Sequence, residues 1–392
     1  MIVTNYWNCA WRSLTKKKGF SVVNIVGLAM ILTYVAFEYS YDDMHSRQDR
    51  IFRVEARFYE NGELTDDWAS SSAGYATAMK QNMSAVEDYT RVGSQYYPEQ
   101  VVKYNELLYR ETGIGYAEAN FFDFFDFKLL KGNKESCLDG PNKVVITERI
   151  ARKYFKGADP IGKILIFRSN IGEEACEVTG IMEDMPINTH IRYNLLISYK
   201  TLPKWMDEYW YRHEVYSYVL LKSANLKTQV EEDFPVMAEK YKTEEALKNK
   251  TWAIQLTTLR DIHLNPQKAY EPEVKGNRSS IWVLICTALA ILCIAWINYI
   301  NMTVARSMER AKEIGIRRAS GASRRQVISQ FLFESLVTNS IAFILAIGLM
   351  EALMPSFNNL TGRDLSFSVW FTTSLGWYLL LIFPAGVFLS GF

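Results

Sequence analysis

The stretch IWVLICTALAILCIAWI, residues 281–297, holds no charged side chain and is apolar on every face of a helix. Extended to residue 301, it reaches the roughly 20 residues that a helix needs to cross about 30 Å of hydrocarbon. A buried helix in the core of a soluble protein is the alternative interpretation. The length of the run and its lack of charge favour a membrane-spanning helix over residues 281–301.

A basic segment, residues 302–326, follows this run. Seven of the eight basic residues after position 280 lie between Arg306 and Arg325. Clusters of Lys and Arg beside a membrane span are typical of its cytoplasmic side. A solvated loop that only sets the topology is therefore one interpretation of the segment.

The order of the charges in this segment favours a second interpretation. Read as a helix, ERAKEIGIRRASGASRRQ (309–326) pairs Glu309 with Lys312 and Glu313 with Arg317, and it presents the apolar Ile314 among them. The small residues of ASGAS (319–323) predict a break, after which a new helix begins with Ser323 as its N-cap. Paired charges followed by a break favour a surface that docks a cytoplasmic partner.

Three further apolar segments are predicted to span the membrane, at residues 20–38, 327–354 and 367–392. A cleavable signal peptide is the alternative for the first, because basic residues precede it. No small-x-small cleavage site follows it, however, since the chain continues with EYSYDDMHSRQDR (38–50). An uncleaved anchor is therefore predicted.

The charges of the loops predict the orientation. Basic residues lie in the N-terminal segment 1–19 and again in 302–326, which places both in the cytoplasm. Residues 39–280 hold 32 basic and 37 acidic side chains and would face away from the cytoplasm. The predicted fold class is a multi-pass α-helical membrane protein with a large α+β extracytoplasmic domain inserted between transmembrane helices 1 and 2.

Within residues 39–280, strand-like and helix-like patterns alternate. RIFRVEARFY (50–59) and residues 107–118 read as strands, and NFFDFFDFKLLKGN (120–133) reads as a short core helix capped by Asn120. NKVVITERIARKYFKGADPIGKILIF (142–167) reads as strand, helix and strand, with Thr147 as the N-cap. The stretch from about residue 203 is a candidate second lobe.

The same region shows no pattern for catalysis or metal binding. Its histidines lack metal-ligand spacing, and His190 is interpreted as part of a turn. Asp42, Asp43 and His45 are interpreted as a hydrated, membrane-proximal face. Cys137 and Cys176 are either a disulfide or two free thiols. We therefore expect no enzyme, no metal and no nucleic-acid partner.

The charged segment and its continuation, RAKEIGIRRASGASRRQVISQFLFES (310–335), resemble the cytoplasmic signature of the FtsX domain of MacB/FtsX-type ABC transporter permeases. The matching positions are Arg310, Glu313, Ile314, Gly315, Arg317, Gly321, Ala322, Phe331, Leu332, Glu334 and Ser335. EYSYDDMHSRQDRIFRV (38–54), VVITERIARKYFKGADPIGK (144–163) and VTGIMEDMPINTHIRYNLLIS (178–198) look like blocks of the MacB-like periplasmic core domain. Within the family, the sequence most resembles the permeases that are abundant in Bacteroides and its relatives.

The resemblance implies an inner-membrane permease subunit driven by a separate ABC ATPase. The ATPase-coupling residues that it implies are Glu309, Arg310, Lys312, Glu313, Ile314, Gly315, Arg317, Arg318, Gly321 and Ala322. The chain has no phosphate loop of the G-x-x-x-x-G-K-[ST] type, so no cofactor of its own is expected, and ATP would bind to the partner.

The implied output is movement of the periplasmic domain, a mechanotransmission that serves efflux of a peptide, drug or lipoprotein. Control of a periplasmic cell-wall hydrolase is the alternative, and a membrane sensor is disfavoured because two more spans follow the second. The resemblance also implies a dimer of permease halves and a periplasmic adaptor or outer-membrane partner. The first span is shorter than is usual in the family. The chain stops inside the fourth apolar segment, at FPAGVFLSGF (383–392), so we expect the fourth span to be truncated.

Overall fold

A computed structural model of the chain describes residues 19–93, 99–169, 172–205, 210–213, 215–242, 248–272, 275–321, 323–363 and 365–372. The chain divides into two compact units. One is Tyr41–Gly276, which we call the outer domain, and the other combines Met1–Ser40 with Asn277–Phe392, which we call the helical unit. Each is described by itself.

The described part of the outer domain is built on one mixed sheet, in the order β13-β1-β12-β3-β6-β11-β8-β10-β9-β4-β5, with β2 on β1 and β7 on β10. The strands are β1 (Ile51–Glu60), β2 (Glu63–Asp67), β3 (Val86–Gly93), β4 (Glu99–Tyr104), β5 (Leu107–Thr112), β6 (Ile114–Ala117), β7 (Leu129–Lys131), β8 (Lys143–Thr147), β9 (Ile164–Ser169), β10 (Gly172–Met182), β11 (Leu195–Ser198), β12 (Val215–Leu221) and β13 (Thr251–Thr258). Most pairs are antiparallel, while β6–β11 and β8–β10 are parallel. This architecture agrees with the α+β class that the sequence predicts.

Strand β1 shows why the chain folds this way. Its apolar residues alternate, and Phe52, Val54 and Phe58 enter a core shared with β12, β13 and two helices, α3 (Gly74–Asn82) and α6 (Lys227–Ala238). Strands β12 and β13, from the stretch that was a candidate second lobe, lie on the two sides of β1 in the same sheet. The last two strands of the domain, β12 and β13, therefore complete the sheet around its first strand, β1.

Two details of the local predictions are wrong and one is confirmed. Residues 107–118 form two strands, because Gly113 has a φ of +70° and turns the chain between β5 and β6. Asn120 precedes α4 (Phe121–Phe124) but makes no cap, since its amide donates to Asp88 and to the Tyr89 carbonyl oxygen. Thr147 does cap α5 (Glu148–Phe155), where its hydroxyl accepts from the Ile150 amide.

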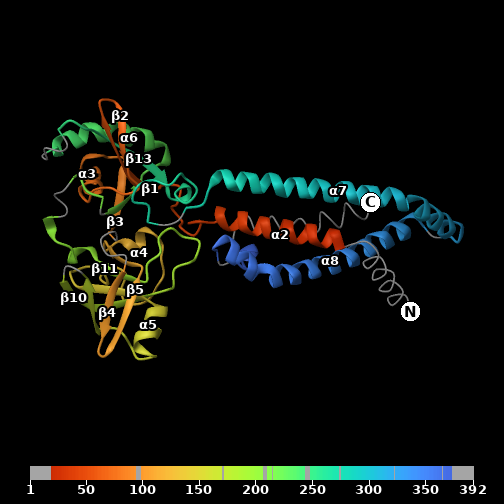
Figure 1. The fold of residues 1–392 in the computed structure, drawn as a ribbon, viewed down its shortest axis with the longest axis horizontal. Helices are drawn as coiled ribbons and strands as arrows, with labels where there is room; N and C mark the ends of the chain where they lie inside the picture. The colour runs from red at the N-terminus through yellow and green to blue at the C-terminus, as the bar shows by residue number, and fades with distance from the viewer. Residues whose placement is uncertain are drawn as a thin grey trace. The chain divides into compact units, whose positions relative to one another are not determined.

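In the helical unit, α2 (Gly19–Tyr39) lies alongside α7 (Arg278–Ala319) and α8 (Arg324–Thr361), as Figure 1 shows, and α9 (Val369–Thr372) also contacts α2. Among the described residues, two helical stretches are long and apolar enough to cross a membrane, Arg278–Ala295 and Phe343–Thr361. The first predicted span contributes a shorter apolar helix, Val26–Tyr39. The N-terminal segment before Gly19 and the fourth predicted span after Thr372 lie outside the described residues.

Polar contacts join α2 to the segment that follows α8. The buried carboxylate of Glu38 accepts from Arg363 Nε at 2.9 Å. Trp370 Nε1 donates to Thr33 Oγ1 at 2.6 Å, and that hydroxyl donates to the Ala29 carbonyl oxygen within α2. Because each of these buried groups has a partner, the end of α2 is fixed within the helical unit.

Candidate functional site

The charged segment is continuous with the span before it. Helix α7 runs without interruption from Arg278 to Ala319, so no boundary separates the predicted span from the predicted coupling segment. Ser320 follows the last helical residue, Ala319, and its amide and hydroxyl both donate to the Ile316 carbonyl oxygen at 3.0 Å. Gly321 then adopts a φ of +89°, the left-handed conformation that ends many helices. The predicted break at residues 319–323 is confirmed.

Helix α8 begins with a complete capping box. Ser323 Oγ accepts from the Gln326 amide at 3.3 Å, and Gln326 Oε1 accepts from the Ser323 amide at 2.9 Å. Two backbone donors that the first turn of a helix leaves free are thereby satisfied. The predicted N-cap at Ser323 is confirmed. We call residues 309–326, the charged end of α7 with this capped turn, the elbow.

The structure places only some of the predicted coupling side chains. Lys312 is exposed, Ile314 is half-buried, and Gly315 and Gly321 lie on the surface. Ile316, which the sequence reasoning overlooked, is 59% exposed and adds a second large apolar side chain to the elbow. The remaining side chains lie outside the described part, so their pairings stay predictions: Glu309, Arg310, Glu313, Arg317, Arg318 and Ala322.

A second site lies where the outer domain begins. We call residues 41–50 the first connector. The interpretation of Asp42 and His45 as a hydrated face is wrong, because both are at most 1% exposed. Asp42 Oδ2 lies 2.7 Å from His190 Nδ1, and its Oδ1 accepts from Thr189 Oγ1 at 2.6 Å. The surrounding core comes from distant parts of the chain, among them Phe121, Phe125, Phe127, Tyr218 and Leu220, so a local pattern of charges cannot indicate this burial.

The electrostatics of this pocket fix the charge of Asp42. Burial by itself raises the pKa of this carboxyl, but His190 beside it and the hydrogen bond from Thr189 outweigh burial and hold the pKa well below its usual range. Burial also raises the pKa of Tyr218, whose hydroxyl lies 3.0 Å from His190 Nε2. Asp42 is therefore a buried carboxylate, and Tyr218 stays protonated. We call Asp42, His45, Thr189, His190 and Tyr218 the histidine pocket.

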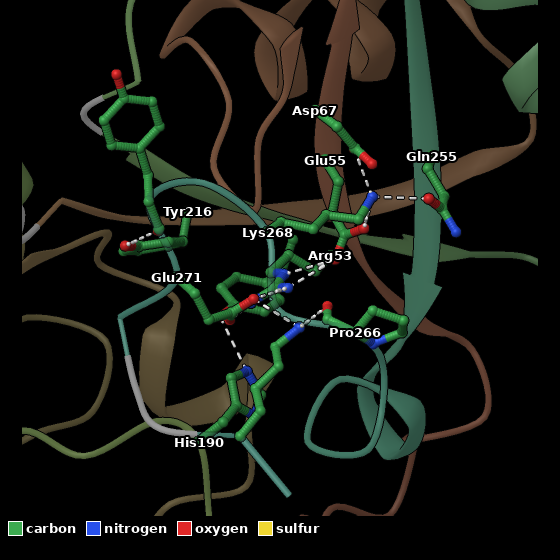
Figure 2. A network of polar contacts seen from close by, with 12 residues as sticks. Arg53, Glu55, Asp67, His190, Tyr216, Gln255, Pro266, Lys268 and Glu271 are labelled. Carbon is green, nitrogen blue, oxygen red and sulfur yellow. Dashed lines mark hydrogen bonds and ion pairs between the residues drawn. The ribbon is translucent and has the colours of Figure 1, made fainter. Parts of the chain in front are cut away.

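A third group of polar residues holds the segment at the end of the domain, residues 259–276, which we call the second connector. Figure 2 shows Arg53 and Glu55 of β1 facing Lys268 and Glu271 of this segment. Arg53 lies 2.6 Å from Glu55 Oε1 through Nη2 and 2.7 Å from Glu271 Oε1 through Nη1. Lys268 Nζ lies 2.9 Å from Glu55 Oε2 and 2.7 Å from Asp67 Oδ1.

Lys275 completes this group. Its Nζ lies 2.6 Å from Glu271 Oε2 and donates to the Pro266 carbonyl oxygen at 3.2 Å. We call these six residues the ion cluster: Arg53, Glu55, Asp67, Lys268, Glu271 and Lys275. The cluster contains as many basic as acidic side chains, so its formal charge is balanced. The side chain of Arg53 is fully buried, and those of Glu55, Glu271 and Lys275 are at most 5% exposed.

The pKa shifts follow from this pairing. For Arg53, burial favours the neutral form, but the charges of Glu55 and Glu271 outweigh burial and raise the pKa. For Glu55, burial is likewise outweighed, here by Arg53 and Lys268, and the pKa is lowered. For Lys275, burial prevails over Glu271 and lowers the pKa. The charged forms of Arg53 and Glu55 therefore stabilise each other, and removing either one leaves the buried cluster with an unbalanced charge.

The two connectors contact each other within the outer domain. The rings of Tyr41 and His263 stack, with centroids 3.4 Å apart and planes 1° from parallel. Arg260 Nε lies 3.9 Å from Asp43 Oδ1. The chain therefore enters and leaves the outer domain through two segments that are attached to each other and, through the histidine pocket and the ion cluster, to the sheet.

The remaining sequence alternatives are decided as follows. Cys137 and Cys176 are buried free thiols, so the disulfide does not form. Burial raises the pKa of Cys137 to about 11 and that of Cys176 to about 12, which keeps both as unreactive thiols. Among the described residues, no group of His, Cys, Asp and Glu is arranged to hold a metal ion.

An α+β domain inserted after the first apolar helix of a helical unit is a layout that membrane permeases with a large extramembrane domain share with membrane sensors. A family model for the MacB-like periplasmic core domain matches residues 22–235, and one for the FtsX-like permease C-terminal region matches residues 285–392. The first match covers more than half of the chain. The chain therefore belongs to the MacB/FtsX-type ABC transporter permeases, a family of transporter subunits rather than enzymes.

The individual relatives have low sequence identity to this chain. The chain is 26% identical over 264 residues to the macrolide export ATP-binding/permease protein MacB of Neisseria meningitidis, covering 64% of this chain and 38% of that protein. It is 24% identical over 361 residues to the probable syringafactin export ATP-binding/permease protein SyfD of Pseudomonas syringae pv. tomato, covering 88% and 50%. The chain spans half or less of the length of these curated relatives.

Among solved structures, a domain of a putative permease from Porphyromonas gingivalis is similar to this chain, with 23% identity and a TM-score of 0.49. That match covers 59% of this chain and 96% of the other. The extracellular domain of the noncanonic ABC-type transporter YknZ from Gram-positive bacteria matches with 16% identity and a TM-score of 0.37, covering 52% and 99%.

Proposed function

We propose that this chain is the permease subunit of an ABC transporter, in which a separate ATPase acts on the elbow and moves the outer domain. The observation that carries the proposal is the continuity of α7, whose 42 residues lead from the second connector to the elbow. At a rise of 1.5 Å per residue, this helix is about 63 Å long. A displacement applied at its charged end would therefore be carried along one continuous helix toward the second connector.

The proposal includes a topology. The chain crosses the inner membrane at residues 20–38, 281–301, 327–354 and 367–392, with the N-terminus and the elbow in the cytoplasm and residues 39–280 in the periplasm. The apolar stretches Arg278–Ala295 and Phe343–Thr361 support two of these spans. The basic residues between Arg306 and Arg325 support the orientation of the elbow.

The partner in the cytoplasm is an ABC ATPase. Permeases of this family work with such ATPases, and the printed names of the two relatives combine ATP-binding and permease functions. ATP would bind to this partner, so the chain needs no cofactor of its own. The basic side chains of the elbow and the exposed Ile316 suit a partner groove that combines acidic and apolar residues.

The proposed mechanism is transmission of movement rather than passage through a polar channel. Closure of the ATPase on ATP tilts α7 and α2, and the connectors pass that movement to the sheet, because the ion cluster and the histidine pocket tie them to it. The outer domain then moves as a rigid body. The movement in the periplasm would expel a peptide, drug or lipoprotein. The complete transporter would contain a dimer of permease halves and an adaptor or outer-membrane partner.

The test uses the full chain purified with the ABC ATPase that is identified as its partner. Replacing Glu313→Ala and Arg317→Ala together removes one acid and one base of the elbow, so the net charge is unchanged. We expect co-purification and stimulation of ATP hydrolysis to fall at least about tenfold, the effect of losing about 1.4 kcal/mol of binding.

The matched control is Asp139→Ala with Lys200→Ala, an exposed pair of the outer domain at 2.5 Å, which also leaves the net charge unchanged. This control should bind and stimulate the ATPase as the wild type does. Undiminished binding and stimulation by the Glu313 and Arg317 variant would overturn the proposal.

A further inference from the structure

His45 makes one strong contact and leaves one ring nitrogen open. Its ring is 1% exposed and packs edge-on against Phe125 and Phe127. Nδ1 lies 2.5 Å from the Phe125 carbonyl oxygen, which can only accept a hydrogen bond. Nδ1 therefore carries a hydrogen, and in the neutral ring Nε2 is an acceptor.

No donor reaches that acceptor. Among the described residues, His45 Nε2 is buried without a hydrogen-bond partner. The charged atom near it is Asp42 Oδ1 at 3.7 Å, which also can only accept. A neutral His45 thus points a lone pair toward a carboxylate oxygen that already accepts from Thr189 Oγ1, and Nε2 lacks the donor that its buried position requires.

His190 contacts the same carboxylate but is satisfied when neutral. Its Nδ1 donates to Asp42 Oδ2 at 2.7 Å, and its Nε2 accepts from the Tyr218 hydroxyl at 3.0 Å. The two histidines that share Asp42 therefore differ. The neutral ring of His190 uses both nitrogens, whereas His45 can use both only after Nε2 takes up a proton.

We propose that His45 is a proton-operated latch for the first connector. Proton uptake at Nε2 turns an unpaired acceptor into a charged donor that faces Asp42, so one ring then links the connector's carboxylate to the Phe125 backbone. This inference concerns the outer domain alone and does not depend on the proposed coupling to an ATPase.

The other titratable and charged groups around the latch are already engaged. Asp126 accepts from the amide and hydroxyl of Ser46 at 2.8 and 2.7 Å. Arg47 donates to the carbonyl oxygens of Asp123 and Phe124. The further groups are Asp43 with Arg260, His263 against Tyr41, and Arg53 in the ion cluster near Tyr218. Among the described ion pairs, Asp42 is the carboxylate that faces His45.

The sign of the pH effect follows. Acidification supplies the missing proton and strengthens the attachment of residues 41–50. Asp42 is held ionised to well below the usual range of a carboxyl, so it still accepts at pH 5.5. Strong acid that protonates Asp42 reverses the effect. The attachment is thus expected to be firmest in mildly acidic medium.

The test is hydrogen–deuterium exchange of the full chain in nanodiscs between pH 8.0 and 5.5, corrected for the intrinsic pH dependence of exchange. In the wild type we expect protection of the amides of residues 42–50 to rise roughly tenfold on acidification, the size of one charge-assisted hydrogen bond gained. The variant His45→Gln cannot titrate and should show no such rise. A matched control, His213→Gln, changes a histidine that stacks on Tyr270 outside the pocket. This variant should still show the rise in protection on acidification.

Two outcomes would overturn the proposed latch. In the first, amide protection of residues 42–50 in the wild type stays level or falls as the pH is lowered from 8.0 to 5.5. In the second, His45→Gln shows the same rise in protection as the wild type. If His45→Gln does not fold, Asp42→Asn tests the same contact from its other side and should also abolish the acid-induced rise.

Discussion

The guanidinium of Arg53 and the carboxylate of Glu271 lie 218 positions apart in the chain, yet they make two contacts, at 2.7 and 3.2 Å, with both side chains buried. Arg53 belongs to the first strand of the outer domain and Glu271 to the segment that leads to α7. This pair therefore attaches the end of the domain to its beginning, at the place where movement of α7 would have to enter the sheet.

Removing Arg53 should release the second connector. The variant Arg53→Met keeps the bulk of the side chain but removes one of the two cations that face each of Glu55 and Glu271, and the unbalanced buried charge costs about 3–5 kcal/mol. Hydrogen–deuterium exchange should show faster exchange in residues 259–272. The matched control Arg110→Met breaks an exposed contact with Glu99 at 3.4 Å and should leave exchange unchanged. Equal protection in the wild type and Arg53→Met would show that the cluster does not hold the connector.

Glu55 should shape the acid stability of the domain. Its pKa is lowered in the folded protein, so its contribution is complete above the unfolded value of about 4.3 and is lost as pH falls below it. The variant Glu55→Gln should be less stable at pH 7 and lose less stability between pH 5 and 3. Urea unfolding of the full chain followed by tryptophan fluorescence measures both effects. The exposed Glu99→Gln is the control. An equal loss of stability between pH 5 and 3 in the wild type and in Glu55→Gln would contradict the role of Glu55.

The ion cluster also shows what a sequence pattern cannot provide. The alternation in RIFRVEARFY correctly predicts a strand with Phe52, Val54 and Phe58 on the core side. Arg53 and Glu55 alternate with these apolar residues and yet are buried, because Lys268 and Glu271 of the second connector pair with them. That cover comes from the far end of the domain, and no local spacing encodes it. Asp42 and His45 are buried for the same kind of reason.

The elbow, by contrast, depends on local chemistry, and its break and cap could be predicted. Removing the cap with Ser323→Ala should cost about 1 kcal/mol and speed exchange of the first-turn amides of α8. Ser320→Ala is the matched control, because the Ser320 hydroxyl donates to the last turn of α7 and caps nothing. If both variants exchange alike at Gln326 and Val327, the capping box does not stabilise the start of α8.

Two glycines of the elbow should respond in opposite directions. Gly321 has a φ of +89°, so Gly321→Ala forces a side chain into the left-handed region and should destabilise the elbow by about 1–2 kcal/mol. Gly315 lies within α7 and has open space around it, so Gly315→Ala should stabilise the helix by about 0.5–1 kcal/mol. Exchange of residues 312–328 should quicken in the first variant and slow in the second. A gain in protection in both would mean that the left-handed turn is not required.

The most direct test of the account asks whether the elbow touches the ATPase. A photo-cross-linking amino acid is placed at Ile316, which is 59% exposed on α7, or at Leu360, which is 83% exposed near the end of α8. The full chain is then irradiated in membranes together with the ABC ATPase that is identified as its partner. We predict a cross-link to the ATPase from position 316 and none from position 360. Absence of a cross-link from position 316, or equal cross-linking from both positions, would contradict the account.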